Sequence, residues 1–259
     1  IYKRFQTMKI QYCSDLHLEF HKNKKYLLEN PIIPTAEILV LAGDIIPFAI
    51  LDQHQEFFDY LSDHFEMVFW IPGNYEYYHS DIHQRTGSFE EKIRENVILL
   101  NNKVKSFGET KLIFSTLWSY ISPQNKFEIQ QSLSDFRLIK NAGKAFDTKA
   151  FTNLFLENFN FLKTAIVEEK SFKKVIVTHH VPTMLNYPPQ YKGSVINQAF
   201  ATELSEFIEE NEIDYWLYGH HHYNSEIFEI GKTKLLTNQL GYVRSNEHFG
   251  YRNDAIFEI

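Results

Sequence analysis

The sequence predicts an α/β (α+β) fold in which two β-sheets are flanked by helices. Short apolar runs rich in β-branched and aromatic residues alternate with longer amphipathic stretches along most of the chain, and consecutive short strands follow near its C-terminal end. This mixture of βαβ units and late strands is typical of two sheets with helices outside them. No Gly/Ser/Pro-rich linker divides the 259 residues, so we expect an N-terminal extension over residues 1–7 and a single domain over residues 8–259.

The individual elements follow from local patterns. Segments that are short, β-branched or aromatic, and bounded by Gly, Pro, Asn or Asp are expected to be strands. These are residues 9–13, 37–41, 67–71, 111–115, 173–178 and 213–218, with closing strands at 225–230, 233–237 and 254–259. Helical periodicity of the apolar residues predicts helices over 52–64, 82–95, 148–170 and 197–211.

The composition excludes several classes of protein. Hydrophobic residues make up 44% and charged residues 23%, with 10 Gly and 8 Pro, which excludes collagen-like and disordered chains. With 26 Lys and Arg against 33 Asp and Glu, the net charge is −7. An acidic surface disfavours long nucleic acid, because binding of nucleic acid depends on cations that neutralise phosphates.

Cysteine usage and hydropathy suggest a compartment. Cys13 is the one cysteine, so no internal disulfide can form, as is typical of a reducing environment. The most apolar stretch, residues 38–51, is interrupted by Asp44 and Pro47 and is shorter than the ~20 residues of a membrane span. The first seven residues do not resemble a secretory signal. We therefore expect a cytoplasmic protein that does not span a membrane.

Polar side chains follow the predicted buried strands at the points where these strands end. In α/β sheets, ligand sites form outside the carboxyl ends of the strands, so these side chains are expected to converge. In chain order the segments are Ser14-Asp15-Leu16-His17, Ala42-Gly43-Asp44, Pro72-Gly73-Asn74-Tyr75-Glu76, Thr178-His179-His180 and Gly219-His220-His221-His222. On an extended segment, Asp15 and His17 point the same way, as do His220 and His222.

The chemistry of these residues fits metal binding. Carboxylate, imidazole and amide oxygen without thiolate suit Mn, Fe or Zn rather than a structural Cys-rich zinc site. The candidate ligands are Asp15, His17, Asp44, Asn74, His179, His220 and His222. They exceed the needs of one tetrahedral ion and suffice for two ions that share a bridging Asp. Two ions ~3.5–4 Å apart form a clamp for displacement at phosphorus.

The order Asp-x-His, Gly-Asp, Gly-Asn, His and Gly-His-x-His resembles the calcineurin-like metallophosphoesterase superfamily. The resemblance extends from Met8 to about Tyr242. A subgroup of small prokaryotic-type members also has stretches similar to residues 15–20 and 76–78. The resemblance implies a pair of mixed sheets sandwiched between helices, in four αββα layers.

The resemblance also implies a role for each candidate ligand. Asp15, His17 and His222 would hold one ion, Asn74, His179 and His220 the other, and Asp44 would bridge the two. A bridging hydroxide would attack the phosphoester, and the ions and remaining imidazoles would stabilise charge on the phosphoryl oxygens.

Two positions depart from the family pattern. In this chain, Tyr75 occupies the position of the histidine in the family's Gly-Asn-His motif. In the family, that histidine commonly stabilises the transition state or protonates the leaving group. With a pKa of ~10, a tyrosine is a weaker proton donor than imidazolium. We therefore expect either slow turnover of esters with poor leaving groups or a substitute proton donor, for which His79, His180 and His221 are the nearby candidates. The expected catalytic residues are Asp44, Asn74, Tyr75 and His180. Pro47 replaces a supporting Asp of the family.

Some assignments stay open at the level of sequence. Spacing does not decide between His179 and His180 as the ligand, although the family pattern favours the first. His221 is expected outside the ligand set, behind it or at the surface. Residues 187–191 form either a substrate-shaping loop or a rigid surface turn, and Arg137 either reaches a phosphate or forms a salt bridge.

The predicted function is that of a dinuclear metal-dependent phosphoesterase acting on a small phosphodiester. Phosphomonoesters and pyrophosphate-linked nucleotides are the next substrate classes. A non-catalytic interaction module on the same fold is the alternative from a different class, and Tyr75 is the feature that favours it. The expected partner is a small phosphorylated substrate, and the sequence does not define the oligomeric state.

Overall fold

A computed structural model describes residues 7–168 and 173–259. The predicted extension over residues 1–7 therefore lies, apart from Thr7, outside the described residues, as do the last two residues of the helix predicted to end at residue 170. Among the described residues, no helix combines the length and the apolar character needed to cross a bilayer.

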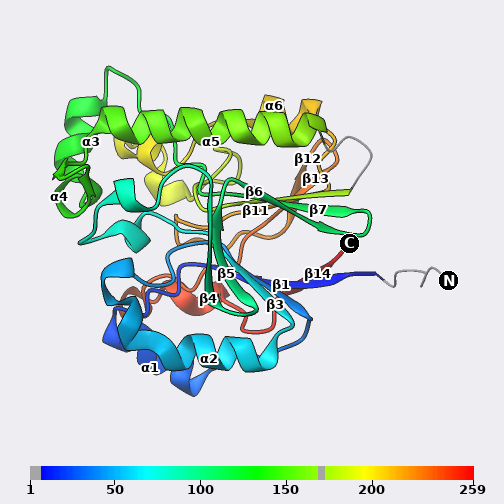
Figure 1. Ribbon diagram of the computed structural model, residues 1–259. Helices are drawn as coiled ribbons and strands as arrows, with labels where there is room; N and C mark the ends of the chain where they lie inside the picture. The colour runs from blue at the N-terminus through cyan, green and yellow to red at the C-terminus, as the bar shows by residue number, and fades with distance from the viewer. Residues whose placement is uncertain (1–6, 169–172) are drawn as a thin grey trace.

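The chain forms two mixed six-stranded sheets packed face to face, which confirms the predicted fold class (Figure 1). The first sheet has the order β14-β1-β2-β3-β5-β4. Its strands are β1 (Lys9–Cys13), β2 (Ile38–Leu41), β3 (Met67–Trp70), β4 (Phe89–Arg94), β5 (Val97–Asn101) and β14 (Ile256–Glu258). The inner strands β1, β2, β3 and β5 are parallel to one another, whereas the edge strands β14 and β4 are antiparallel to their neighbours.

The second sheet repeats this plan in the order β12-β13-β11-β10-β7-β6. Its strands are β6 (Lys103–Phe107), β7 (Thr110–Ser115), β10 (Lys173–Thr178), β11 (Tyr215–Leu217), β12 (Phe228–Ile230) and β13 (Thr233–Leu236). Here too the inner strands are parallel and the edge strands β12 and β6 antiparallel. A short hairpin of β8 (Lys140–Asn141) and β9 (Lys144–Ala145) stands apart from both sheets.

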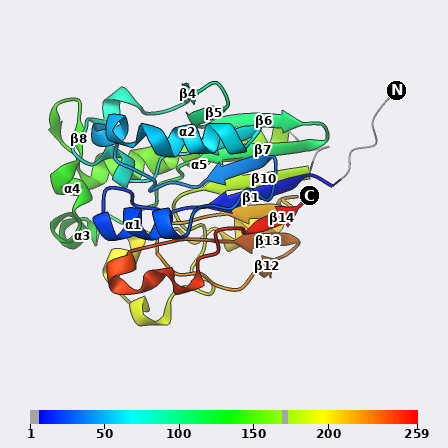
Figure 2. The same ribbon diagram turned by 90° about the horizontal axis from the view of Figure 1, so that it is seen from below.

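Helices cover the outer faces of the sandwich. On the first sheet lie α1 (His21–Glu29) and α2 (Gln55–His64), which Figure 2 shows from their own side. On the second sheet lies α5 (Thr148–Glu168), with α6 (Ser205–Glu210) nearby (Figure 1). The short helices α3 (Lys126–Ser132) and α4 (Asp135–Leu138) lie at the end of the sandwich opposite the C-terminus (Figure 2).

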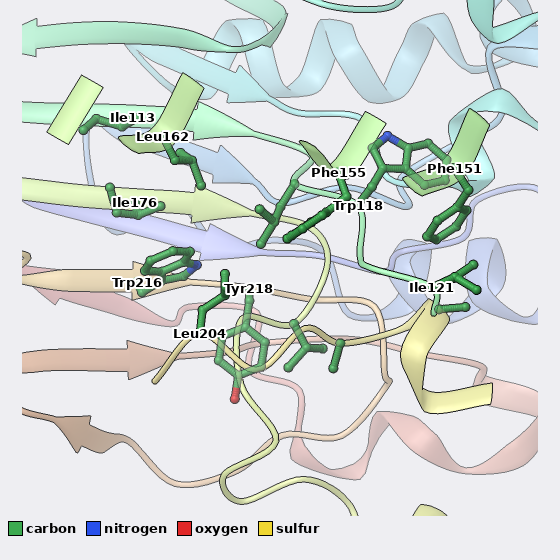
Figure 3. Packing of buried hydrophobic residues seen from close by; sticks show 14 of the residues in the cluster. Ile113, Trp118, Ile121, Phe151, Phe155, Leu162, Ile176, Leu204, Trp216 and Tyr218 are labelled. Atoms are coloured by element: carbon green, nitrogen blue, oxygen red, sulfur yellow. The ribbon is translucent and has the colours of Figure 1, made fainter. Parts of the chain in front are cut away.

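Three buried clusters correspond to these layers. Between the sheets, Val40 and Phe69 of the first sheet pack with Val177 of the second. Outside the second sheet, Ile113, Ile176 and Trp216 belong to the cluster that receives apolar side chains of α5 (Figure 3). The apolar residues of α5 recur at helical spacing, so they form a single stripe facing the sheet.

Two predicted helices are wrong in whole or in part. Residues 82–95 form a single 3₁₀ turn (Ile82–Gln84) followed by β4, because residues 89–94 pair antiparallel with the buried β5, with Phe89 opposite Asn101 and Glu91 opposite Leu99. The helix predicted over 197–211 is divided into the 3₁₀ segment Val195–Ala199 and α6. A β-bridge between Val181 and Ala201 interrupts it.

Candidate metal centre

The predicted ligands come together where parallel strands of both sheets end. Asp15 and His17 follow β1, Asp44 follows β2 and Asn74 follows β3, all in the first sheet. His179 follows β10 and His220 follows β11 in the second sheet. Because the two sheets present their carboxyl ends at the same edge of the sandwich, residues far apart in the sequence meet in one crevice.

The backbone at these positions is turned rather than extended. Asp15, His17, Asp44, His220 and His222 have φ angles of 56°, 48°, 55°, 80° and 52°, in the left-handed region that L-residues seldom adopt. We expected each pair of candidate ligands to lie on one side of an extended segment. The pairs do come together, but the segments that carry them are turned and not extended. Hydrogen bonds from Asp15 N to the Gly43 carbonyl (2.9 Å) and from His17 N to the Asp44 carbonyl (3.0 Å) hold the turns. Such strain is concentrated at functional sites.

Glycines in the sequence blocks let the ligands approach one another. A Cβ at Gly73 would collide with the Asp44 carboxylate and the His179 ring. A Cβ at Gly219 would lie 2.6 Å from Asp15 Oδ2. The glycines before Asn74 and His220 are therefore required by close packing of the candidate ligands.

The ligand atoms form two groups that share Asp44. Asp15, His17, Asp44 and His222 make up site 1, and Asp44, His179 and His220 make up site 2. Within each group the ligand atoms lie within 4.8 Å of one another. The family resemblance implied the same grouping with Asn74 added to the second set, and the binding of ions by these residues stays a prediction.

Short contacts define each group. In site 1, His222 Nε2 lies 3.0 Å from His17 Nε2 and 3.3 Å from Asp15 Oδ1. In site 2, His179 Nε2 lies 3.1 Å from His220 Nδ1 and 3.4 Å from Asp44 Oδ1. Ring nitrogens that face each other at these distances need a proton or a cation between them.

Asn74 lines the same cavity as Asp44 and His220, and it has an unpaired oxygen. Its Nδ2 donates to Asp135 Oδ1 (3.0 Å), whereas its buried Oδ1 has no hydrogen-bond partner within the described residues. An unpaired buried acceptor costs about 1–3 kcal/mol unless a ligand satisfies it. This orphaned oxygen and the oxygen–nitrogen donor set fit a bound cation.

Outer partners orient the imidazoles. His17 Nδ1 donates to Glu19 (3.0 Å) and His222 Nδ1 donates to Glu247 (2.7 Å). His179 Nδ1 donates to the carbonyl of Ala42 (2.9 Å). In each case Nε2 is left facing the cluster, which is the arrangement common around metal-binding histidines.

The charges in the cluster are strongly coupled. Burial alone would lower the pKa of His222, but hydrogen bonds and charge from Asp15 and Glu247 outweigh it and raise this pKa to about 10. Burial likewise opposes protonation of His179, but Asp44 raises its pKa to about 9. Burial alone would raise the pKa of Asp15, but its bond to His222 keeps it well below the usual range. Without metal, protons on these imidazoles therefore balance the buried carboxylates.

Glu76 organises the loops that carry the ligands. It is fully buried and accepts hydrogen bonds from the backbone N–H groups of Asp44 (2.9 Å), Ile45 (2.7 Å) and Gly73 (2.7 Å). It thereby links the ends of β2 and β3. This support comes from the loop after β3, whereas Pro47 occupies the supporting Asp position of the family pattern.

Tyr75, at the family's histidine position, lies against site 1. Its ring is 4.5 Å from that of His17, and its hydroxyl hydrogen-bonds to the hydroxyl of Tyr242. Its backbone N–H donates to Asp44 Oδ1 (2.9 Å). Burial raises the pKa of Tyr75 to about 12, so its hydroxyl stays neutral at ordinary pH.

The three histidines considered as substitutes for Tyr75 occupy different surroundings. His180 is fully buried against Trp118, both its ring nitrogens lack partners among the described residues, and burial keeps its pKa well below the usual value. It does not line the cavity, so its position does not support the predicted catalytic role. His79 is exposed. His221 lines the cavity but is buried rather than at the surface, and burial lowers its pKa to about 4.

Sequence analysis missed several residues that contact the ligands. Glu19, Asp135, Tyr242 and Glu247 come from loops or short helices and have no fixed spacing relative to the ligand blocks. A polar residue in a loop shows no periodicity, so only the three-dimensional structure identifies these partners. Arg137 is exposed, donates to the Gln131 carbonyl, and does not line the cavity.

Comparisons with known proteins show which family the chain resembles. A model of the calcineurin-like phosphoesterase family matches residues 8–224. An uncharacterized protein, L509, of Acanthamoeba polyphaga mimivirus is 32% identical, over 93% of both chains.

Among solved structures, phosphopantetheinyl hydrolase (PptH) from Mycobacterium tuberculosis superposes with a TM-score of 0.70 at 17% identity, covering 98% of this chain and 96% of that one. A dimetal phosphatase from Danio rerio gives 0.48 at 11% identity, covering 90% and 87%. The first likeness shows a shared fold, and the family model shows membership over most of the chain. The chain belongs to the calcineurin-like phosphoesterase family.

Proposed function

We propose that this protein hydrolyses a small phosphodiester with the help of two metal ions. The observation that carries the proposal is the pair of overlapping ligand groups that share Asp44 at the strand ends. Family membership supports hydrolysis of a phosphoester and the use of divalent metal ions.

The residues present suit two ions. Asp15, His17 and His222 would hold one, His179, His220 and the oxygen of Asn74 would hold the other, and Asp44 would contact both. When bound, the ions supply Lewis-acid chemistry, which activates water and offsets negative charge at phosphorus. Mn, Fe and Zn all suit this mixture of oxygen and nitrogen ligands.

Tyr75 and Tyr242 take the place of the family's histidine. In their hydroxyl pair one O–H donates to the other oxygen, so one proton remains available to a phosphoryl or leaving-group oxygen. Because burial raises both pKa values, the pair donates hydrogen bonds without ionising. We expect esters with good leaving groups to be cleaved much faster than esters with poor ones.

The surroundings of the centre favour a diester over a monoester. No lysine or arginine is among the described residues that line the adjoining cavity, whereas Asp44, Asp135 and Glu247 are. A dianionic monoester would find no cationic side chain beside the ions to neutralise its second negative charge. A monoanionic diester needs less positive charge and can place its second substituent in the cavity. Because one structural neighbour is a phosphopantetheinyl hydrolase, we include a small phosphopantetheinyl ester in the substrate panel.

The test compares hydrolysis of bis-p-nitrophenyl phosphate and p-nitrophenyl phosphate by metal-free protein and by protein reconstituted with Mn²⁺ or Zn²⁺. We expect metal-dependent cleavage with a higher kcat/KM for the diester. A higher kcat/KM for the monoester would overturn the diester preference. Metal binding without turnover of either ester would favour the non-catalytic interaction module that Tyr75 suggests.

A further inference from the structure

The cavity beside the candidate metal centre has six tyrosine and phenylalanine side chains in its lining. Its volume is about 340 Å³, within the range of small-molecule sites. The aromatic lining consists of Tyr75, Tyr78, Tyr187, Tyr191, Phe200 and Tyr242. Apolar ring surface next to a phosphate-binding centre suits a substrate whose alcohol carries a flat apolar group.

Tyr187 and Tyr191 form one wall of the cavity, which we call the tyrosine wall. The ring of Tyr187 is half-buried and lies edge-on to His221, with 5.5 Å between ring centroids. Tyr191 also lines the cavity, yet 44% of it remains exposed. A large aromatic residue that is exposed at the rim of a cavity has ring surface to offer a ligand.

The backbone of the tyrosine wall is fixed. Pro188 and Pro189 restrict the chain between the two tyrosines. The N–H of Tyr191 donates to the Pro188 carbonyl (3.0 Å), and the carbonyl of Tyr191 accepts from the buried Asn197 side chain (2.7 Å). The backbone that carries the tyrosine wall is therefore held in place before a ligand arrives, which reduces the backbone entropy lost on binding.

The charge of the cavity narrows the class of ligand further. With Asp44, Asp135 and Glu247 in its lining and no lysine or arginine among its described lining residues, the cavity disfavours phosphates beyond the one at the ions. Pyrophosphate-linked nucleotides are thereby less suitable than a molecule with a single phosphate.

We propose that the cavity binds a planar aromatic or heteroaromatic group on one alcohol of a phosphodiester, and that this group packs against the tyrosine wall. The proposal rests on the function proposed above and specifies its substrate class. It assigns residues 187–191 to substrate recognition, one of the two roles that the sequence left open.

The test compares two diesters that release the same leaving group. The second substituent of bis-p-nitrophenyl phosphate is aromatic, whereas that of methyl p-nitrophenyl phosphate is a methyl group. We expect Tyr191→Ala in the Mn²⁺-loaded protein to lower kcat/KM about tenfold for the first ester and less than about twofold for the second, mainly through KM. Tyr191→Phe should retain the wild-type ratio. Tyr120→Ala is the matched control, because Tyr120 is 42% exposed and does not line the cavity.

The outcomes separate the two proposals. Hydrolysis of both esters with a ratio that Tyr191→Ala leaves unchanged would overturn the aromatic subsite but not the phosphoesterase. If wild type cleaves neither ester, the proposed function fails, and calorimetry with phenylphosphonate and methylphosphonate then tests the subsite alone. The subsite predicts that Tyr191→Ala weakens only phenylphosphonate binding, and equal binding of phenylphosphonate by both proteins would contradict it.

Discussion

Site 1 and site 2 share Asp44 but differ in the charge around them. Site 1 has Asp15 as a second carboxylate, and Glu19 and Glu247 stand behind its imidazoles. Site 2 has Asp44 as its one carboxylate within the described group, its His179 is oriented by a backbone carbonyl, and Asp135 is the one carboxylate that we place behind it, through Asn74. Because a cation is stabilised by nearby negative charge, we expect site 1 to bind its ion more tightly. The proposed centre would thus have two unequal ion sites at equivalent strand ends.

The largest effect is expected where the two sites overlap. Asp44→Asn removes the shared charge, so we expect both ions to be lost and diester hydrolysis to fall by at least about 1,000-fold. Metal content and kcat/KM measure the two losses. Asp59→Asn, in an exposed ion pair with Arg94, is the control and should change neither. Retention of both ions by Asp44→Asn would refute the shared ligand.

Single-site variants sharpen the comparison. His222→Gln should abolish the tighter of two Mn²⁺ binding events, and His220→Gln should abolish the weaker, because each removes a ligand of one site. Calorimetric titration of metal-free protein resolves the two events. If both variants lost the same event, the division into two sites would be wrong.

Removing the charge of Glu247, an outer carboxylate of site 1, should lower metal affinity less than removing a ligand. Glu247→Gln weakens the acceptor that orients His222, and we expect the affinity of the tighter event to fall about 10- to 100-fold. The weaker event should be unchanged. The exposed Glu226 provides the matched substitution, Glu226→Gln, which should leave both affinities at wild-type values.

Metal affinity should depend on pH, because protons compete with the metal for the histidines. The pKa values of His222 and His179 are raised to about 10 and about 9, so both carry protons at pH 7 that a metal must displace. Metal affinity should therefore rise by up to about tenfold per pH unit for each proton released, up to about pH 9. Calorimetry in buffers of different ionisation enthalpy measures this release, and no proton release at pH 7 would contradict it.

The same shifts predict how stability depends on pH. Protonation of these histidines in the folded state stabilises the metal-free protein fully below about pH 6.5, their unfolded pKa, and this stability is lost as pH rises through about 9 to 10. Thermal unfolding of metal-free protein should show a Tm that decreases over this window. A Tm that increases across it would contradict the sign.

The smallest effect is expected at the support of site 2. Asp135→Asn keeps the size of the side chain but weakens the acceptor that holds the Asn74 amide, so we expect a loss of about tenfold in the affinity of the weaker event. Tyr78→Phe removes a hydroxyl that donates to Asp135 and should have a smaller effect in the same direction. A change in the tighter event instead would show that Asn74 serves site 1.

Much of the fold could be predicted from sequence because the inner parallel strands are short, continuous and apolar. The helix predicted over residues 82–95 is wrong because pairing with β5 overrides the local periodicity there. The buried strand β5 and the helix α1 were not predicted.

The candidate ligands could be found because glycine and polar residues recur after strands. Their conformation could not, since the left-handed turns at Asp15, His17 and Asp44 depend on contacts between separate strand ends. Glu247 and Asp135 could not be predicted, because tertiary packing positions the short helices that begin with them and sequence spacing does not encode that packing.

The most direct test of the central claim is an anomalous difference map from crystals of the Mn²⁺-loaded protein. Two sites that share a carboxylate predict two peaks, one beside His222 and one beside His179, with Asp44 in contact with both. A single peak, or two peaks of which only one touches Asp44, would contradict the shared centre on which the proposed chemistry rests.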